Sequence, residues 1–131
     1  PYYKKVTSAF RRKGVDVAIV DSDGDVNPLI PLWLEGGVNG FLPLEVQAGM
    51  DAVSLREKYG DKIILMGNIS LWTLRRGPKA IDEEVSKKFF SLLPGGGYIA
   101  STDHHIPPDV SYENFMHYLR RVQKWGRYSV G

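Results

Sequence analysis

The 131-residue sequence contains no cysteine. This absence excludes disulfides and thiolate metal ligands, and it is typical of a protein from a reducing compartment. No apolar run approaches the roughly 18 to 20 residues that cross a bilayer. No charged and then apolar leader opens the sequence either. We therefore expect no membrane partner and a cytoplasmic location.

The sequence also lacks a concentrated run of basic residues. Its 17 Lys and Arg exceed its 15 Asp and Glu by only two charges, and basic pairs such as Arg11-Arg12 and Arg120-Arg121 are scattered. Nucleic-acid binding usually needs a concentrated basic surface, so we expect no nucleic-acid partner. The hydrophobic content of 43% and the charged content of 24% are ordinary for globular proteins. We expect one domain over residues 1–131.

One plan repeats four times along the sequence: an apolar run, then an acidic or amide residue, then a helical pattern. A helix over Tyr2–Lys13 precedes the first repeat, with Gly14 as its stop. The first apolar run is β-branched and nearly free of polar residues, which is typical of a parallel strand covered on both faces. The expected strands are 15–20, 38–42, 62–66 and 97–100, and the helices between and after them cover about 28–35, 50–59, 78–92 and 111–125.

Capping residues and apolar spacing define these helices. Asn27 and Pro28 predict the start of the first of them, and Ser70 predicts a cap for a short turn through Leu71 to Leu74. In the helix that Pro78 opens, Ile81, Val85, Phe89 and Leu92 form one apolar stripe. In the last helix the expected inward side chains are Tyr112, Phe115, Leu119 and Val122.

The order α-βα-βα-βα-βα predicts an α/β fold with parallel strands, because helical crossovers join parallel neighbours. Four such units correspond to half of a TIM-type (β/α)8 barrel. Half a barrel leaves an apolar inner face and two strand edges uncovered. The cover would come from an N-terminal segment or from a second copy in a homodimer; a flat four-stranded sheet is the third possibility.

Polar side chains follow each expected strand. In parallel α/β folds these positions surround one mouth, where small-molecule substrates bind. Asp23 either faces this mouth or bonds to its own turn, and Glu45 either faces it or anchors a loop. A titratable imidazole at this place suits proton transfer, anion binding or metal ligation. The candidates are Asp21, Ser22, Asp23, Glu45, Asn68, Ser101, Asp103, His104 and His105.

Five short motifs, in order and spacing, resemble the uroporphyrinogen decarboxylase family. They are Asp21-Ser22-Asp23-Gly24, Gly36 to Gly40 with Pro43-Leu44-Glu45, Tyr59 to Lys62 leading to Gly67-Asn68-Ile69, Gly97-Tyr98-Ile99, and Asp103-His104 with Pro107-Pro108-Asp109 and Glu113-Asn114. The resemblance covers nearly the whole chain. It implies the C-terminal half of a (β/α) barrel with its cleft at the strand C-termini.

The resemblance implies two chemistries. In the decarboxylases, which need no cofactor, a histidine after the last strand contacts the substrate and falls on His104. The Gly-Asn segment matches Gly67-Asn68, but an aspartate of the decarboxylases is replaced here by Ser70. Their other principal residues, an arginine-rich segment and an aspartate, belong to the N-terminal half. We therefore expect no decarboxylation by this chain alone.

The related methyltransferases pass a methyl group between a corrinoid and a thiol with zinc. Their His-x-Cys ligand pair falls on Asp21 and Asp23, and their later cysteine falls at or beside His104. Without thiolates, an oxygen-rich site of Asp21, Asp23, Glu45 and His104 would hold a divalent metal such as zinc.

Three hypotheses follow. The leading one is the C-terminal half of a uroporphyrinogen decarboxylase-like enzyme acting on an anionic tetrapyrrole-like substrate. Its catalytic residues are His104 and Asp21, and its substrate-binding residues are Ser22, Asp23, Glu45, Asn68 and Asp103. The second is a methyltransferase with a divalent metal and a corrinoid protein as partner. The third is a self-associating half-barrel without catalysis.

Overall fold

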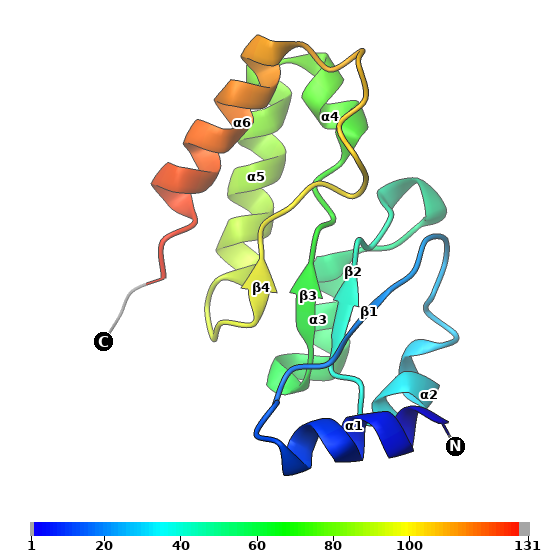
Figure 1. Ribbon diagram of the computed structural model, residues 1–131. Helices are drawn as coiled ribbons and strands as arrows, with labels where there is room; N and C mark the ends of the chain where they lie inside the picture. Colours follow the sequence, from blue (N-terminus) through cyan, green and yellow to red (C-terminus); the bar gives the residue numbers. More distant parts are fainter. Residues whose placement is uncertain (1, 129–131) are drawn as a thin grey trace.

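Four parallel strands form one sheet in the order β1-β2-β3-β4. The computed structural model describes residues 2–128, and Figure 1 shows helices following the strands as the repeats predict. This confirms the expected α/β fold of parallel units, the arrangement found in part of a (β/α)8 barrel. The elements are α1 (Tyr2–Arg12), β1 (Ile19–Asp21), α2 (Ile30–Glu35), β2 (Gly40–Leu42), η1 (Val46–Ala48), α3 (Ala52–Tyr59), η2 (Gly60–Lys62), β3 (Ile64–Met66), α4 (Leu71–Arg76), α5 (Pro78–Leu92), β4 (Tyr98–Ile99) and α6 (Tyr112–Trp125).

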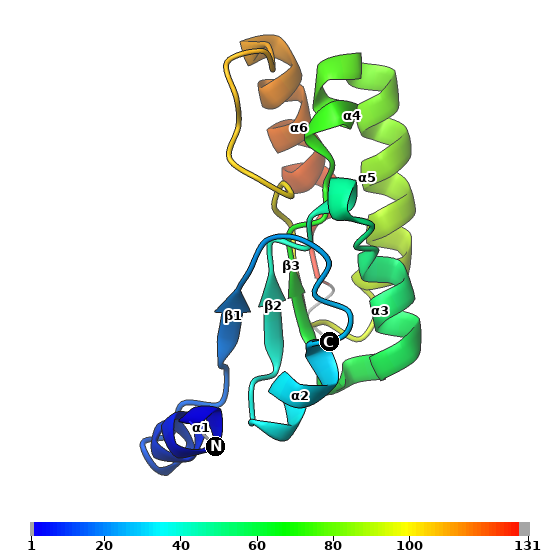
Figure 2. The same cartoon turned by 90° about the vertical axis from the view of Figure 1, so that its right-hand side faces the viewer.

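Helices α3 and α5 cover one face of the sheet (Figure 2). The strand register places Val20, Phe41, Leu65 and Tyr98 in one row across the sheet, so their side chains share this face. Phe41 is stacked on Trp33 of α2 with ring centroids 6.0 Å apart. The predicted stripe of α5 is confirmed, because Ile81, Val85, Phe89 and Leu92 are all buried. The core therefore lies between the sheet and its helices.

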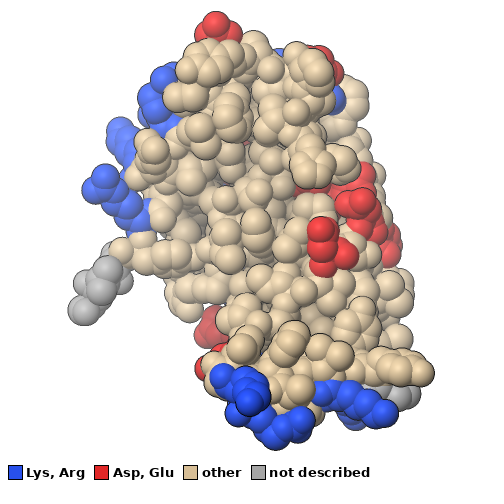
Figure 3. Space-filling model, viewed as in Figure 1, with Lys and Arg blue, Asp and Glu red and all other residues tan. Residues whose placement is uncertain are grey.

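The other face of the sheet is apolar and uncovered by the described residues. Side chains alternate along a strand, so the residues on either side of the buried row point to this face. Ile19 is 37% exposed and Ile99 is 45% exposed. Figure 3 looks onto this side, and its centre carries few charged groups. The remaining members of the face are Leu42, Ile64 and Met66.

The first strand is shorter than predicted and is not covered on both faces. Pairing begins at Ile19, opposite Gly40, and Val15 and Val17 remain 44% and 47% exposed. The prediction was wrong because a β-branched run becomes a strand only where a neighbouring strand offers backbone partners. Just before Ile19, the Ala18 carbonyl accepts the backbone N–H groups of Asn39 and Gly40, both at 3.0 Å. The Ala18 N–H, in contrast, donates to the side-chain Oδ1 of Asn39 at 2.9 Å.

Three details near helix starts also differ from the prediction. Helix α2 begins at Ile30 with Pro31 in its first turn, and Asn27 instead donates to Asp25 at 2.8 Å. Ser70 precedes α4 without a side-chain cap bond. Tyr112 is 72% exposed because it occupies the first turn of α6, ahead of the packed stripe. Ser111, at the expected start of the last helix, caps α6 by accepting the Asn114 N–H.

An ion-pair cluster joins α5 to α6. Asp82 accepts from His117 Nε2 at 2.7 Å and from Arg121 Nε at 2.6 Å. The hydrogen bond from Arg121 lowers the pKa of the Asp82 carboxyl, and His117 adds to this effect. The cluster gives His117 a place in helix packing, remote from the strand ends.

Candidate active site

A cleft of about 510 Å³ lies at the carboxyl ends of the strands. Its polar wall includes Asp21, the last residue of β1, Asp23 just beyond it, and His104 after β4. The structure thus brings together five of the predicted residues from opposite edges of the sheet: Asp21, Asp23, Ser101, His104 and His105. The remaining lining residues are Leu42, Pro43, Met66, Thr102 and Ile106.

The apolar floor of this cleft was missed at the sequence level. Leu42 and Met66 end β2 and β3 and belong to the uncovered face of the sheet. Alternation of side chains within these two strands is the sequence signal that indicates this floor. The cleft therefore combines an apolar base with acidic and imidazole groups at its rim, which is a common composition of small-molecule sites.

The imidazole of His104 has a defined tautomer when neutral. The backbone N–H of His105 donates to its Nδ1 at 2.9 Å, so Nδ1 carries no proton. The proton of the neutral ring is then on Nε2, which becomes a hydrogen-bond donor. The loop is held by Thr102, whose hydroxyl donates to the His104 carbonyl at 2.8 Å. His104 can therefore present an N–H to a bound molecule.

The rim next to β1 is acidic. Asp21, Asp23 and Asp25 are all exposed along five residues of loop, and Figure 3 shows acidic side chains gathered on that flank. The basic side chains of α1 lie at the opposite end of the strands (Figures 1 and 3). Such a rim favours ligand N–H groups or cations and disfavours carboxylates.

The proposed metal ligands do not gather into a metal-binding group. Among residues 2–128 no set of three or more His, Asp and Glu side chains is placed to hold an ion. Glu45 is engaged elsewhere, because its Oε2 accepts the N–H of Gly24 at 2.9 Å. The oxygen-rich site of Asp21, Asp23, Glu45 and His104 is therefore not formed in this structure, and its residues do not fit a bound metal.

Asn68 braces the site from below. Its side chain is fully buried, its Oδ1 accepts the Ala52 N–H, and its Nδ2 donates to the carbonyls of Leu44 and Met50 at 2.7 and 2.9 Å. Leu44 has a φ of 59°, which is unfavourable outside glycine and asparagine, so the turn needs such support. Both polar atoms of the Asn68 amide thus bond to the chain itself, while the expected substrate contact of Asn68 stays a prediction.

The other predicted residues also bind backbone groups. Asp103 is only 2% exposed and accepts N–H bonds from Val46 and Leu71. Ser22 is half-buried, and its N–H donates to the Leu42 carbonyl at 3.0 Å. A second cleft of about 330 Å³ adjoins the first at His104, with Glu45 and the exposed Trp72 on its walls.

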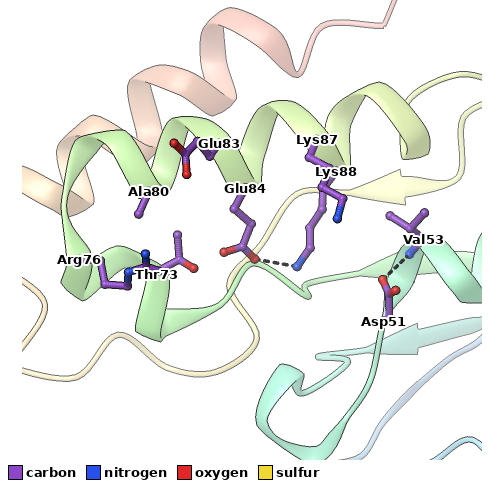
Figure 4. Close-up of a pocket in the computed structure, with 9 residues that line it drawn as sticks. All are labelled: Asp51, Val53, Thr73, Arg76, Ala80, Glu83, Glu84, Lys87 and Lys88. Atoms are coloured by element: carbon purple, nitrogen blue, oxygen red, sulfur yellow. Dashed lines mark hydrogen bonds and ion pairs between the residues drawn. The ribbon is translucent and has the colours of Figure 1, made fainter.

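A separate hollow of about 350 Å³ lies on the helical side, between α3, α4 and α5 (Figure 4). At its floor Glu84 and Lys88 form an ion pair at 2.7 Å. Glu84 also accepts the Ser70 N–H at 2.9 Å, and Lys88 donates to the Asn68 carbonyl. The pair therefore fixes the segment that follows β3.

The parallel sheet, its helices and the cleft at the strand ends are the arrangement found in part of a (β/α) barrel. The chain belongs to the uroporphyrinogen decarboxylase family, whose sequence model, "Uroporphyrinogen decarboxylase (URO-D)", matches residues 1–125. This confirms the resemblance found in the motifs.

Individual relatives agree with the family match. A uroporphyrinogen decarboxylase of Pseudomonas fluorescens (strain Pf0-1) is 31% identical over 131 residues, covering 93% of this chain and 36% of that protein. Those of Pseudomonas putida (strain W619) and Pseudomonas entomophila (strain L48) are each 30% identical, with the same coverage. The chain spans only 36% of the length of these relatives. Within residues 2–128 no helix is both long and apolar enough to span a membrane.

Proposed function

We propose that this chain forms the C-terminal half of the mouth of a cytoplasmic uroporphyrinogen decarboxylase-like enzyme. The observation that carries the proposal is the cleft shared by Asp21, Asp23 and His104 in a chain of this family. The substrate would be an anionic tetrapyrrole-like molecule. Catalysis would need the rest of the barrel, and the proposal needs no cofactor.

The chemistry divides between the two sides of the cleft. Decarboxylation breaks a carbon–carbon bond, releases CO₂ and leaves an electron pair on carbon that must be protonated. His104 would supply this proton or bond to the leaving carboxylate through its Nε2–H. Asp21 and Asp23, with Ser22 beside them, would accept hydrogen bonds from pyrrole N–H groups. The acidic rim repels the substrate's carboxylates, so their cationic partners would belong to the other half of the barrel.

Tetrapyrrole binding tests the proposal. His104→Ala should weaken the binding of uroporphyrinogen, kept reduced during the titration, by about tenfold, the usual order for one charge-assisted hydrogen bond. His105→Ala is the matched control, because its ring lies beside that of His104 and has no assigned role. The measurement is fluorescence or calorimetric titration of the full chain. Absence of binding by the unmodified chain, or equal losses in both variants, would overturn the proposal.

The metal-dependent alternative receives no support from the placement of its ligands, so we derive no step of methyl transfer or corrinoid binding from it. The proposal does need a partner for the uncovered sheet face. This partner would be the missing half of the barrel or, in its absence, a second copy of the chain, because apolar residues of all four strands belong to that face.

Self-association should depend on this face. At micromolar concentration the chain should form dimers, and Ile99→Asp should shift it toward monomer, because burying a carboxylate in an apolar contact is costly. Phe90→Asp is the control: Phe90 is 85% exposed but belongs to α5 on the other side of the sheet. Light scattering reports both masses. A monomeric unmodified chain would contradict the dimer, and dimers disrupted only by Phe90→Asp would place the contact elsewhere.

A further inference from the structure

Asp103 lies where the segments that follow β2, β3 and β4 meet; we call these segments the strand exits. It follows β4, directly before His104, and its own N–H donates to the Ile69 carbonyl at 2.9 Å. The parallel bridge between Ile69 and Thr102 extends the pairing of β3 and β4 up to this point. The backbone of Asp103 is therefore fixed by the sheet, while its side chain points away from solvent.

The two carboxylate oxygens of Asp103 serve two different segments. Oδ2 accepts the N–H of Val46 at 3.1 Å, and Oδ1 accepts the N–H of Leu71 at 3.0 Å. Val46 directly follows Glu45 after β2, and Leu71 is the first residue of α4 after β3. One side chain thus joins the exits of β2 and β3 to that of β4, across 57 and 32 residues of sequence.

The carboxylate has no ion-pair partner among residues 2–128. Burial raises its pKa, and the bonds from Leu71 and Val46 oppose this effect without cancelling it. A buried charge without a counter-ion costs stability. The charged and titratable groups around it are Glu84 and Lys88 on α5, Arg75 on α4, Glu45 after β2, and His104 and His105 after β4.

We propose that Asp103 is a positioning residue whose ionised carboxylate holds the exits of β2 and β3 against β4, and so sets where Glu45 and His104 stand at the mouth. This role rests on the proposed function for its effect on substrate. The bracing itself is a property of this chain alone. It also replaces the expectation that Asp103 contacts the substrate, because both of its oxygens are engaged within the chain.

Protonation of Asp103 should have opposite effects on local order and on overall stability. A carboxyl group whose folded pKa is raised adds stability below its unfolded pKa, and this stability is lost as pH rises through the folded value. Acidification should therefore raise the free energy of unfolding relative to Asp103→Asn, which cannot titrate. The neutral acid, however, is a weaker acceptor, so the N–H groups of Val46 and Leu71 should exchange faster.

The brace is our name for the two hydrogen bonds by which Asp103 holds Val46 and Leu71. Amide hydrogen exchange by NMR tests this brace on the full chain. In Asp103→Ala the N–H groups of Val46 and Leu71 should both exchange about tenfold faster or more, after correction for overall stability. Asp103→Asn keeps one acceptor oxygen, so it should release at least one of the two. Asp51→Asn is the matched control: Asp51 accepts the Val53 N–H at 3.0 Å, so only α3 should respond.

Acidification of the unmodified chain provides a test that requires no variant. Intrinsic exchange rates are first divided out at each pH. Faster exchange of both amides, together with a gain in stability relative to Asp103→Asn, supports the brace. The brace is overturned if the Val46 and Leu71 amides keep their protection both in acid and in Asp103→Ala. It is also overturned if acid lowers both this protection and the stability relative to Asp103→Asn.

Uroporphyrinogen titration separates the brace from the proposed function. If the unmodified chain binds the tetrapyrrole and Asp103→Asn binds it more weakly, both stand. If the unmodified chain fails to bind, the proposed function fails, while the exchange results still decide the brace. If Asp103→Asn speeds exchange of the Val46 and Leu71 amides but binds the tetrapyrrole as tightly as the unmodified chain, the positioning role is overturned.

Discussion

Replacing Gly67 by alanine should destabilise the chain by about 4 kcal/mol, at the exceptional end for one substitution. Gly67 follows β3 with a φ of +102°, and a Cβ built there would lie 2.1 Å from the Pro43 carbonyl oxygen. That oxygen also accepts the Asn68 N–H at 2.9 Å. The added methyl group must therefore displace the backbone after β2. Urea unfolding of the chain measures the loss.

Gly77→Ala separates the backbone strain from the steric clash. Gly77 has a similar φ of +98°, but nothing lies within 4 Å of its built Cβ. Its replacement should cost only the strain of its glycine-type backbone conformation, about 1–3 kcal/mol. Similar losses in the two variants would show that the contact with Pro43 relaxes easily.

Asn68→Ala should have the second largest effect, about 3 kcal/mol. The substitution removes three buried hydrogen bonds and leaves the Leu44 and Met50 carbonyls and the Ala52 N–H without these partners. Each unsatisfied buried group costs about 1–3 kcal/mol, although the effects are not additive. Asn68 also has a φ of 65°, a conformation that alanine adopts less readily. Thermal or urea unfolding measures the change.

Two comparisons isolate the hydrogen bonds of Asn68. Asn114→Ala removes a single bond, from Nδ2 to the Leu74 carbonyl at 2.7 Å, and should cost about 1 kcal/mol. Asn68→Gly removes the same amide as Asn68→Ala but tolerates the positive φ. A loss in Asn68→Gly no greater than that in Asn114→Ala would mean that backbone strain, not bonding, makes Asn68 important.

The order of the units could be predicted because each signal is local. The stripe of Ile81, Val85, Phe89 and Leu92 repeats at helical spacing, and its burial is confirmed. The limits of the strands could not be predicted, because they depend on a neighbouring strand. Ile19 is the first paired residue of β1 only because Gly40 stands opposite it.

Part of the candidate site could be predicted for a similar reason. The rule that parallel strands end at one edge places Asp21, Asp23 and His104 together, and the cleft contains all three. The structural roles of Asn68 and Asp103 could not be predicted from this rule. Their partners are backbone groups 16 to 57 residues away, and backbone groups have no signature in a sequence.

The strand exits of this chain are tied to one another by side chains of its own. Glu45 links the exits of β1 and β2, Asn68 those of β2 and β3, and Asp103 those of β2, β3 and β4. In the proposed barrel, this half of the mouth would therefore be ordered before the other half binds. The entropy cost of ordering its loops would then not weaken the association of the two halves. The association would be the docking of a preformed surface, driven by burial of the apolar sheet face.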